Sequence, residues 1–261
     1  MSQQSLHTLV IGDVHGRADL LDEILWGIKR KAERQHFSYR IIFIGDIIDR
    51  GPDSSGAMDL VTATLKDLPG SELILGNHEW LLLRILEHEG DENETKFCSH
   101  WTSSTIGGMD TLRSYGFPGG KVSAAVIRQF MDPKHISCFR RAKSYVELEH
   151  HILVHAGLKP GVPLSEQSAY EMSWIRTEFL SHPGLFQKIV VHGHSITPSG
   201  QVEVYPNRIG IDTGAFRTGI LSALHIVPGG EISVIQAHES AVPSVCGFRE
   251  VEPIERSYPE T

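Results

Sequence analysis

Five short polar motifs follow one another along this chain, and each comes directly after an apolar run that is typical of a β-strand. They are GDVHG (residues 12–16), GDIIDRG (45–51), GNHE (76–79), HAG (155–157) and HGH (192–194). Helix-forming segments separate the first three runs. Because the carboxyl ends of parallel strands meet at one edge of a sheet, the pattern predicts an α/β fold (α+β in some classifications) with the motifs side by side.

Hydrophobic periodicity places the other elements. Helices are expected at residues 18–34 and 79–89, and in a segment capped by Ser54 or Ser55. Strands are expected at 8–11, 40–44, 72–75, 146–154, 188–191, 209–211, 219–227 and 231–237. The last two are joined by Pro-Gly-Gly, which predicts an antiparallel pair.

The length of 261 residues favours one compact domain, which we place at residues 1–238. Residues 90–150 are richer in Ser, Thr and Gly, and they predict a cap region of short helices and loops within this domain. Residues 239–261 lack periodicity and contain three prolines. We expect them to form a tail of packed coil that gives way to disorder.

Composition excludes several classes of protein. The formal net charge of −8 argues against a general nucleic-acid binder. The three cysteines are scattered without a CxxC spacing, which indicates neither a disulfide framework nor a zinc–thiolate site. No apolar run approaches membrane-spanning length, and the polar N-terminus lacks the apolar stretch of a signal peptide. We therefore expect a soluble cytoplasmic protein that binds no membrane.

The motifs supply six side chains that bind metals: Asp13, His15, Asp46, Asn77, His155 and His194. Two carboxylates, one amide oxygen and three imidazoles suit a pair of divalent cations; we expect Mn²⁺, with Fe or Zn as alternatives. Asp46 is predicted to bridge both cations, because its two oxygens can hold ions about 3.5–4 Å apart. Two such cations generate hydroxide at neutral pH and clamp phosphoryl oxygens during in-line displacement.

The leaving alkoxide also needs a proton, and His78 is placed beside the ligand Asn77 to supply it. Asp49 would keep this imidazole protonated through a charge-assisted hydrogen bond. Arg50 and Arg176 carry planar guanidinium groups that can grip phosphate oxygens, and we expect Asn77 to contact the phosphate as well. In the alternative interpretation, His78 and Asp49 only orient a metal ligand.

GDVHG, GDIIDRGPDS, GNHE, HAGL and HGHS resemble the phosphoprotein phosphatase (PPP) family, especially its compact bacterial and phage serine/threonine phosphatases. The likeness covers residues 6–227 and extends to IGGMDTLRSYG, SWIRTEFL and GIDTGAFRTGILSALHI. It implies the calcineurin-like αββα sandwich, a first metal on residues matching Asp13, His15 and Asp46, and a second on those matching Asp46, Asn77, His155 and His194. It also implies an acid pair at His78 and Asp49 and a phosphate-binding arginine at Arg176.

A related branch cleaves diadenosine tetraphosphate symmetrically and provides the alternative function. That branch typically has Ala in place of Asp49 and GNHD in place of GNHE, so both positions follow the protein phosphatases. Ile47 and Ile48 depart from the more usual aromatic-Val pair, and HAG and HGH replace the eukaryotic HGG and RAH. A third hypothesis, a non-catalytic scaffold, is disfavoured by the intact ligand set. The expected partner is a phosphorylated protein or peptide, or a small phosphoester.

Overall fold

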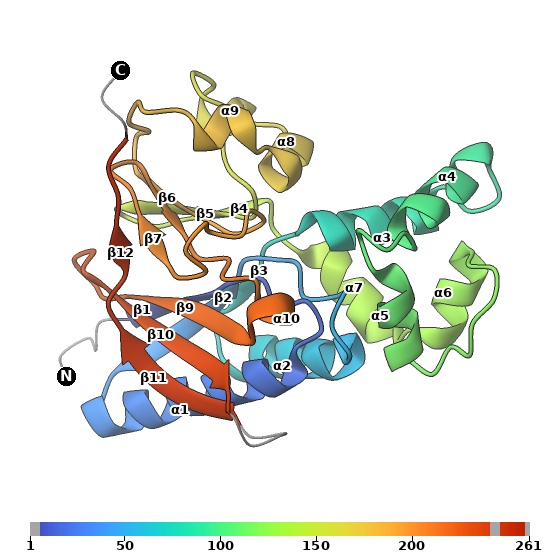
Figure 1. Cartoon of the computed structure of the whole chain (residues 1–261), viewed down its shortest axis with the longest axis horizontal. Helices are drawn as coiled ribbons and strands as arrows, with labels where there is room; N and C mark the ends of the chain where they lie inside the picture. The colour runs from blue at the N-terminus through green and yellow to red at the C-terminus, as the bar shows by residue number, and fades with distance from the viewer. Residues whose placement is uncertain (1–5, 241–245, 259–261) are drawn as a thin grey trace.

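The computed structural model describes residues 6–240 and 246–258. Two six-stranded sheets are present in these residues. The sheets pack face to face, helices cover the two outer surfaces, and a helical extension projects from one side (Figure 1). This arrangement confirms the predicted αββα sandwich.

The first sheet has the strand order β11-β10-β9-β1-β2-β3. Its strands are β1 (Leu6–Ile11), β2 (Ser38–Phe43), β3 (Glu72–Leu73), β9 (Ile220–Ile226), β10 (Ile232–Glu239) and β11 (Cys246–Val251). β1, β2 and β3 run parallel, because a helix connects each to the next. β9, β10 and β11 continue the sheet in antiparallel fashion from the other side of β1.

The second sheet has the order β12-β7-β8-β6-β5-β4. Its strands are β4 (Tyr145–Glu147), β5 (His151–Val154), β6 (Ile189–His192), β7 (Glu203–Val204), β8 (Arg208–Gly210) and β12 (Ile254–Glu255). β5, β6 and β8 are parallel neighbours. The carboxyl ends of β5 and β6 therefore lie together, and these ends carry the HAG and HGH motifs.

Alternation along β1 shows how the core is divided. Leu9 and Ile11 point to the helices outside the first sheet, whereas Val10 between them points to the second sheet. Val10 belongs there to a buried cluster with Leu153 and Val191 from the opposite sheet. The inner strands β1, β5 and β6 are thus buried on two faces, which explains why the sequence shows continuous apolar runs there.

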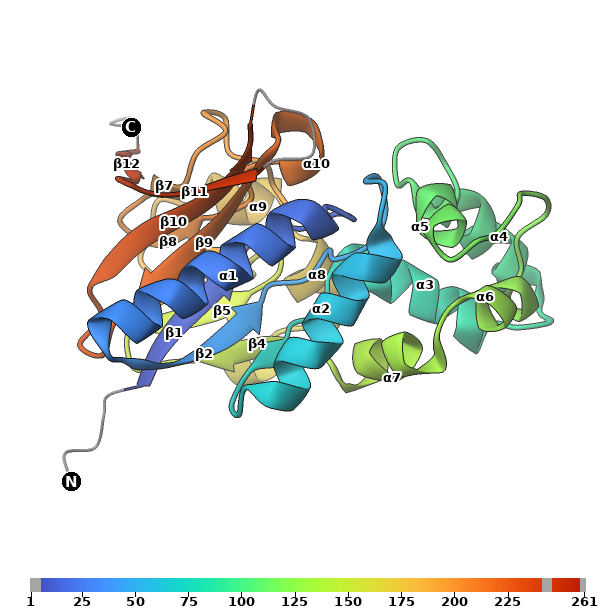
Figure 2. The same ribbon diagram turned by 90° about the horizontal axis from the view of Figure 1, so that it is seen from below.

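Helices α1 (Ala18–Gln35) and α2 (Ser54–Asp67) cover the outer face of the first sheet (Figure 2). α8 (Ala169–Trp174) and α9 (Thr177–Leu180) lie over the second sheet, where Met172 and Phe179 join its buried cluster. Two shorter elements are the 3₁₀ helix Leu164–Glu166 and α10 (Ala215–Thr218). None of the helices in residues 6–240 and 246–258 combines the length and the apolar character that a membrane crossing requires.

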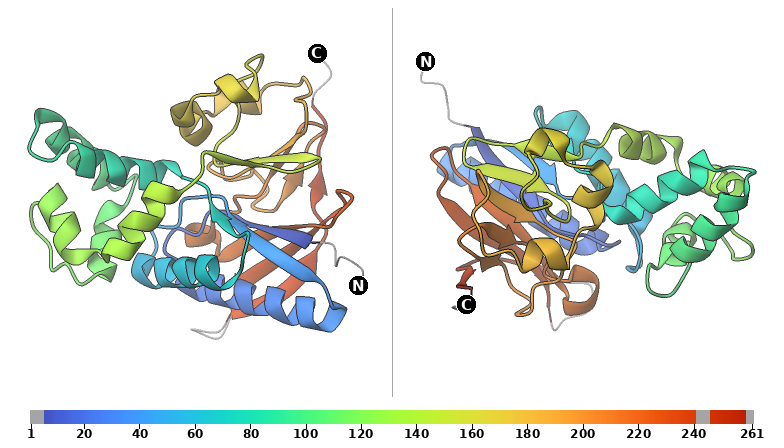
Figure 3. Two further views of the ribbon diagram at one scale, coloured as in Figure 1. Left: turned by 180° about the vertical axis from the view of Figure 1, so that it is seen from behind. Right: turned by 90° about the horizontal axis from the view of Figure 1, so that it is seen from above.

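The extension is seen from two more sides in Figure 3. It consists of α3 (Asn77–Glu87), α4 (Glu92–Trp101), α5 (Gly108–Ser114), α6 (Ala124–Phe130) and α7 (Pro133–Arg141). Side chains of Asp91, Ser123 and Asp132 accept backbone N–H groups at the starts of α4, α6 and α7. These local caps account for the short helices expected in this region.

Two sequence predictions were wrong. Residues 146–154 do not form one strand, because Leu148 N donates to His151 O and turns the chain into the antiparallel β4–β5 hairpin. The segment after residue 239 was expected to be coil, yet β11 pairs with β10 and β12 pairs with β7. Edge strands are held by backbone bonds and a few contacts, so they need no long periodic pattern. Phe248 of β11 packs directly against Gly27 of α1.

Candidate metal centre and active site

The strand ends and helix starts bring the predicted site residues to one edge of the sandwich. Asp13 and His15 follow β1; Asp46, Asp49 and Arg50 follow β2; Asn77 and His78 open α3 after β3; His155 follows β5, His194 follows β6, and Arg176 directly precedes α9. α3 begins two residues earlier than predicted. As a result, two of these side chains come from a helix's first turn instead of from the loop before it.

The loops that carry these residues are strained and tightly packed. His15, Asp46, Asp49, Arg50 and His194 all have positive φ angles, between 45° and 74°. Such conformations cost on the order of 1–3 kcal/mol each and persist where the surroundings fix them. They turn the side chains away from the strand directions and towards a common centre.

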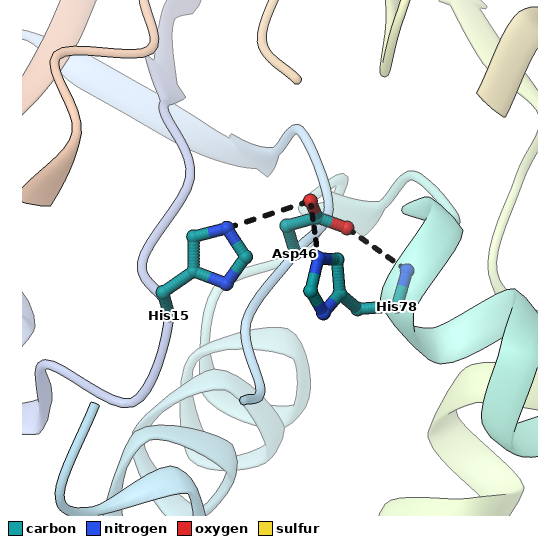
Figure 4. A group of neighbouring side chains, drawn as sticks. All are labelled: His15, Asp46 and His78. Atoms are coloured by element: carbon teal, nitrogen blue, oxygen red, sulfur yellow. Dashed lines mark hydrogen bonds and ion pairs between the residues drawn. The ribbon is translucent and has the colours of Figure 1, made fainter. Parts of the chain in front are cut away.

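Asp46 lies at that centre (Figure 4). Its Oδ2 is 3.6 Å from His15 Nε2 and 3.7 Å from His78 Nε2. Its Oδ1 is 3.3 Å from His155 Nε2 and accepts a hydrogen bond of 3.1 Å from the backbone N–H of His78. The two oxygens thus face different groups of side chains, as a bridging carboxylate requires.

The second group of side chains meets at the amide oxygen of Asn77. This Oδ1 lies 3.1 Å from His155 Nε2 and 2.7 Å from His194 Nδ1. Asp13 joins the cluster from β1, where its Oδ2 accepts a 2.9 Å bond from the backbone N–H of His194. All six predicted ligands are therefore linked by direct contacts, and all are buried.

The chemistry of these contacts suits cations. His155 Nδ1 donates to the carbonyl oxygen of Ile44, which directs its Nε2 at the oxygens of Asn77 and Asp46. Burial opposes protonation of this ring, yet the carboxylate of Asp46 and other neighbouring carboxylates raise the pKa of His155 to about 10, so positive charge is favoured at this position. In addition, Asp13 Oδ1 is buried without a hydrogen-bond partner among the described residues. Both features fit metal ligands.

Electrostatics at the centre agree with this interpretation. Burial, and then the negative charges of Asp212 and Asp46, hold the pKa of Asp13 well above its ordinary value. Burial also opposes ionisation of Asp46, yet the neighbouring imidazoles, His155 foremost, keep its pKa well below the ordinary value. An unpaired buried carboxylate is costly, and adding positive charge relieves that cost.

His78 and Asp49 form a buried pair beside the centre. His78 Nδ1 is 2.7 Å from Asp49 Oδ2, while His78 Nε2 has no hydrogen-bond partner among the described residues. Asp49 also accepts hydrogen bonds from Trp101 Nε1 (2.9 Å) and Thr111 Oγ1 (2.5 Å). The helical extension thus fixes the Asp49 carboxyl group, and Asp49 in turn fixes the imidazole ring.

Protonation of this pair is shifted by its surroundings. Burial lowers the pKa of His78 to about 4, with the positive charges of Arg50 and His155 acting in the same direction. Burial raises the pKa of Asp49 well above its ordinary value. When the pair carries two protons, one lies between Nδ1 and Oδ2 and the other is on His78 Nε2; with the first proton on Asp49, the imidazole is neutral. The pair can therefore present an N–H group without a free imidazolium.

Arginines border the centre on its open side. Arg50 Nη1 lies 2.9 Å from His15 Nε2, and Arg176 Nε donates to His194 Nε2 at 2.8 Å. Both line a hollow of about 770 Å³, which we call the arginine hollow; it is also lined by residues 104, 105, 107, 110, 177, 180, 194–196, 216 and 217. An anion entering this hollow meets the two guanidinium groups next to the predicted ligands.

Comparison with known protein families identifies the one to which this chain belongs. A model described as calcineurin-like phosphoesterase matches residues 6–202. The chain belongs to the calcineurin-like phosphoesterase family. The family and the two His/Asp clusters suit a binuclear divalent metal site, and the protein is a phosphoester hydrolase by family.

Individual relatives of this phosphoesterase are more distant. Over 96 residues it is 38% identical to the asymmetrical bis(5′-nucleosyl)-tetraphosphatase PrpE of Oceanobacillus iheyensis, a match that covers 33% of this chain and 38% of that relative. The matched part is thus little more than a third of that relative's length.

Two solved structures share the fold. A proposed diadenosine tetraphosphatase has a TM-score of 0.61 at 20% identity, over 90% of this chain and 95% of that one. A cold-active protein-tyrosine phosphatase of a psychrophilic Shewanella species has a TM-score of 0.53 at 16% identity, over 95% and 82%. At these identities, the likeness establishes the fold of the phosphoesterase and nothing finer.

Sequence reasoning missed two carboxyl groups of this phosphoesterase. Glu79 is fully buried and accepts the backbone N–H groups of Asp46 (2.9 Å), Ile47 (2.8 Å) and Ile48 (3.2 Å). It therefore positions the loop that presents Asp46. Asp212 is buried near Asp13 and accepts the N–H of Gly214 before α10. The conspicuous motifs GNHE and GIDTG contained both residues, but nothing local revealed what they contact.

Proposed function

We propose that this phosphoesterase is a serine/threonine protein phosphatase that uses two divalent cations, Mn²⁺ in the first place. The observation that carries the proposal is the His78–Asp49 pair, whose 2.7 Å contact is buried beside Asp46. The pair leaves His78 Nε2 without a hydrogen-bond partner among the described residues, 3.7 Å from Asp46 Oδ2. This position suits a proton donor to a leaving group.

In the proposed site, Asp13, His15 and Asp46 would hold one cation, and Asp46, Asn77, His155 and His194 would hold the other. When bound, the cations would supply Lewis-acid stabilisation of the phosphoryl oxygens and activation of a water molecule. The chain itself supplies orientation and charge. Arg50 and Arg176 grip the phosphoryl oxygens from the arginine hollow, together with the Asn77 amide.

The leaving group decides how much the His78–Asp49 pair matters. A serine or threonine alkoxide is a strong base and leaves poorly without a proton, so a general acid accelerates its departure by roughly 10²- to 10⁴-fold. A nucleotide phosphate released from a dinucleoside polyphosphate is a much weaker base and leaves without that help. A buried acid fixed by two further hydrogen bonds from Trp101 and Thr111 therefore favours alkyl phosphate esters.

A second candidate is hydrolysis of a dinucleoside polyphosphate. It is favoured by the partial match to a bis(5′-nucleosyl)-tetraphosphatase and by the fold shared with a proposed diadenosine tetraphosphatase. The open arginine hollow also has room for more than one phosphate. The two candidates share the metal centre and differ in the leaving group.

A side-by-side assay distinguishes them. The Mn²⁺-loaded protein is given phosphoserine and phosphothreonine peptides and, separately, diadenosine tetraphosphate, and kcat/KM is compared. The proposal requires a higher kcat/KM for the peptides. A higher value for the dinucleotide would replace it with the second candidate, and no turnover of either substrate would contradict both.

A further inference from the structure

The arginine hollow contains a third cation that the proposed chemistry does not use. Arg217 lines it together with Arg50 and Arg176. Within residues 6–240 and 246–258, no carboxylate forms an ion pair with any of the three. One acidic residue, Asp110, lines the hollow, and it forms an ion pair with Arg113 at 2.9 Å. Positive charge thus gathers here in a chain whose net charge is −8.

The three arginines are not equivalent. Arg50 and Arg176 each contact a predicted metal ligand, His15 and His194 respectively. One phosphoryl group at the metal centre therefore occupies these two guanidinium groups. Arg217 makes neither contact, and its side chain is exposed. Arg217 is therefore available to bind a second negative group of the substrate.

The backbone that carries Arg217 is held next to the phosphoryl position. In α10, the ring of Phe216 lies 5.3 Å from the ring of His15, and the Arg50 guanidinium lies 4.8 Å from the same phenyl ring. Arg17 Nη1 donates to the carbonyl oxygen of Ala215 at 3.1 Å. Arg17 is itself buried between Asp19 and Glu239. These contacts anchor the backbone of α10, while the Arg217 side chain is exposed to solvent.

The position of α10 also fits an extended substrate. In Figure 1 α10 lies below the part formed by the second sheet with α8 and α9 and to the left of the helical extension, and Figure 2 shows it at an edge of the sandwich. The arginine hollow draws its walls from all three parts, through residues such as Ser104, Thr177 and Phe216. A volume of about 770 Å³ is larger than a phosphoryl group needs and leaves room for neighbouring groups.

We propose that Arg217 binds a second anionic group of the substrate, the carboxylate of an acidic residue that flanks the phosphorylated serine or threonine. This inference rests on the proposed phosphatase function. Guanidinium and carboxylate groups pair through two parallel hydrogen bonds, which gives direction as well as charge. A phosphate on a neighbouring residue has the same acceptor chemistry, so the test includes both sources.

The test uses phosphopeptides of one sequence that carry glutamate, glutamine, lysine or phosphoserine at one position, scanned from three residues before to three after the target phosphate. kcat and KM are measured for the wild-type protein and for Arg217→Gln. At one of the scanned positions the wild type is expected to favour glutamate over glutamine by about 2- to 5-fold in kcat/KM, mainly through a lower KM. Arg217→Gln is expected to lose this preference and to hydrolyse the glutamine peptide at the wild-type rate.

Arg140→Gln provides the matched control, because Arg140 is an exposed arginine on α7 outside the hollow. It must keep the glutamate preference. If Arg217→Gln retains the same preference as the wild type, or if the wild type shows none at any position, the Arg217 subsite is wrong while the phosphatase function stands. If no peptide is hydrolysed although diadenosine tetraphosphate is, the phosphatase function fails and the subsite for a peptide carboxylate fails with it. A preference for phosphoserine without one for glutamate would overturn the carboxylate as the occupant.

Discussion

Replacing Gly51 with alanine places a methyl group inside the contact between the first two motif loops. A Cβ atom at residue 51 would lie 2.0 Å from the carbonyl oxygen of His15 and 2.9 Å from the carbonyl carbon of Gly16. Both atoms belong to backbone, so no side-chain rotation relieves the overlap. Ordinary carbon–oxygen contacts are longer than about 3 Å, and the loops must therefore separate by roughly 1 Å.

This separation acts directly on the centre. The loop of Gly51 also carries Asp46, which faces His15 across 3.6 Å. Overpacking of this kind destabilises a fold by about 1–3 kcal/mol. A displacement of 1 Å in a catalytic arrangement lowers turnover about 10²-fold. We expect Gly51→Ala to lose stability, metal affinity and activity together.

The matched control is Gly184→Ala. The three atoms nearest to its added Cβ all belong to the ring of His182, a partly exposed side chain that can move aside. Its stability should stay within about 0.5 kcal/mol of the wild type. Denaturant unfolding and phosphatase turnover of both variants are measured in parallel. Wild-type stability and turnover in Gly51→Ala would refute the packing of the two loops described here.

Two further variants test the acid pair and the core. His78→Asn should keep its metals but lose about 10²- to 10⁴-fold in kcat on phosphoserine peptides. The loss on aryl phosphates should be smaller, because their leaving group needs less protonation. Equal losses on both ester types would exclude the acid role. His151 is buried, and burial together with the charge of His150 lowers its pKa to about 4. The unfolded chain therefore binds its proton first, so stability should fall as the pH is lowered from about 6.5 towards 4, by about 2 kcal/mol from this residue. Unfolding of His151→Gln at pH 7 and pH 5 should show a smaller pH dependence than the wild type, and an unchanged one would contradict the assignment.

The sequence was sufficient to assemble most of the candidate site because strand geometry orders it. Each motif follows an apolar strand, so parallel pairing of β1, β2 and β3 and of β5 and β6 brings the polar residues to one edge. Asp46 and His155 follow strands of different sheets, and their side chains still meet at 3.3 Å. The roles assigned to these residues remain predictions for the experiments above.

Other features depend on contacts between distant residues that no local pattern indicates. Trp101 and Thr111 bind Asp49 across 52 and 62 residues of sequence. Their positions depend on how the extension folds back over the sandwich. The edge strands β11 and β12 were missed for a related reason, since their pairing depends on partners already in place. Packing of Phe248 against Gly27, for example, is visible only in the folded chain.

Metal content tests the central claim most directly. The purified protein and Asp46→Asn are loaded with Mn²⁺, freed of excess metal, and analysed by mass spectrometry for ions per chain. The wild type should hold two ions, and Asp46→Asn should lose metal and activity together, because its carboxamide has a single acceptor oxygen in the place of two. Two ions retained in Asp46→Asn, or none bound by the wild type, would contradict the binuclear centre bridged by Asp46.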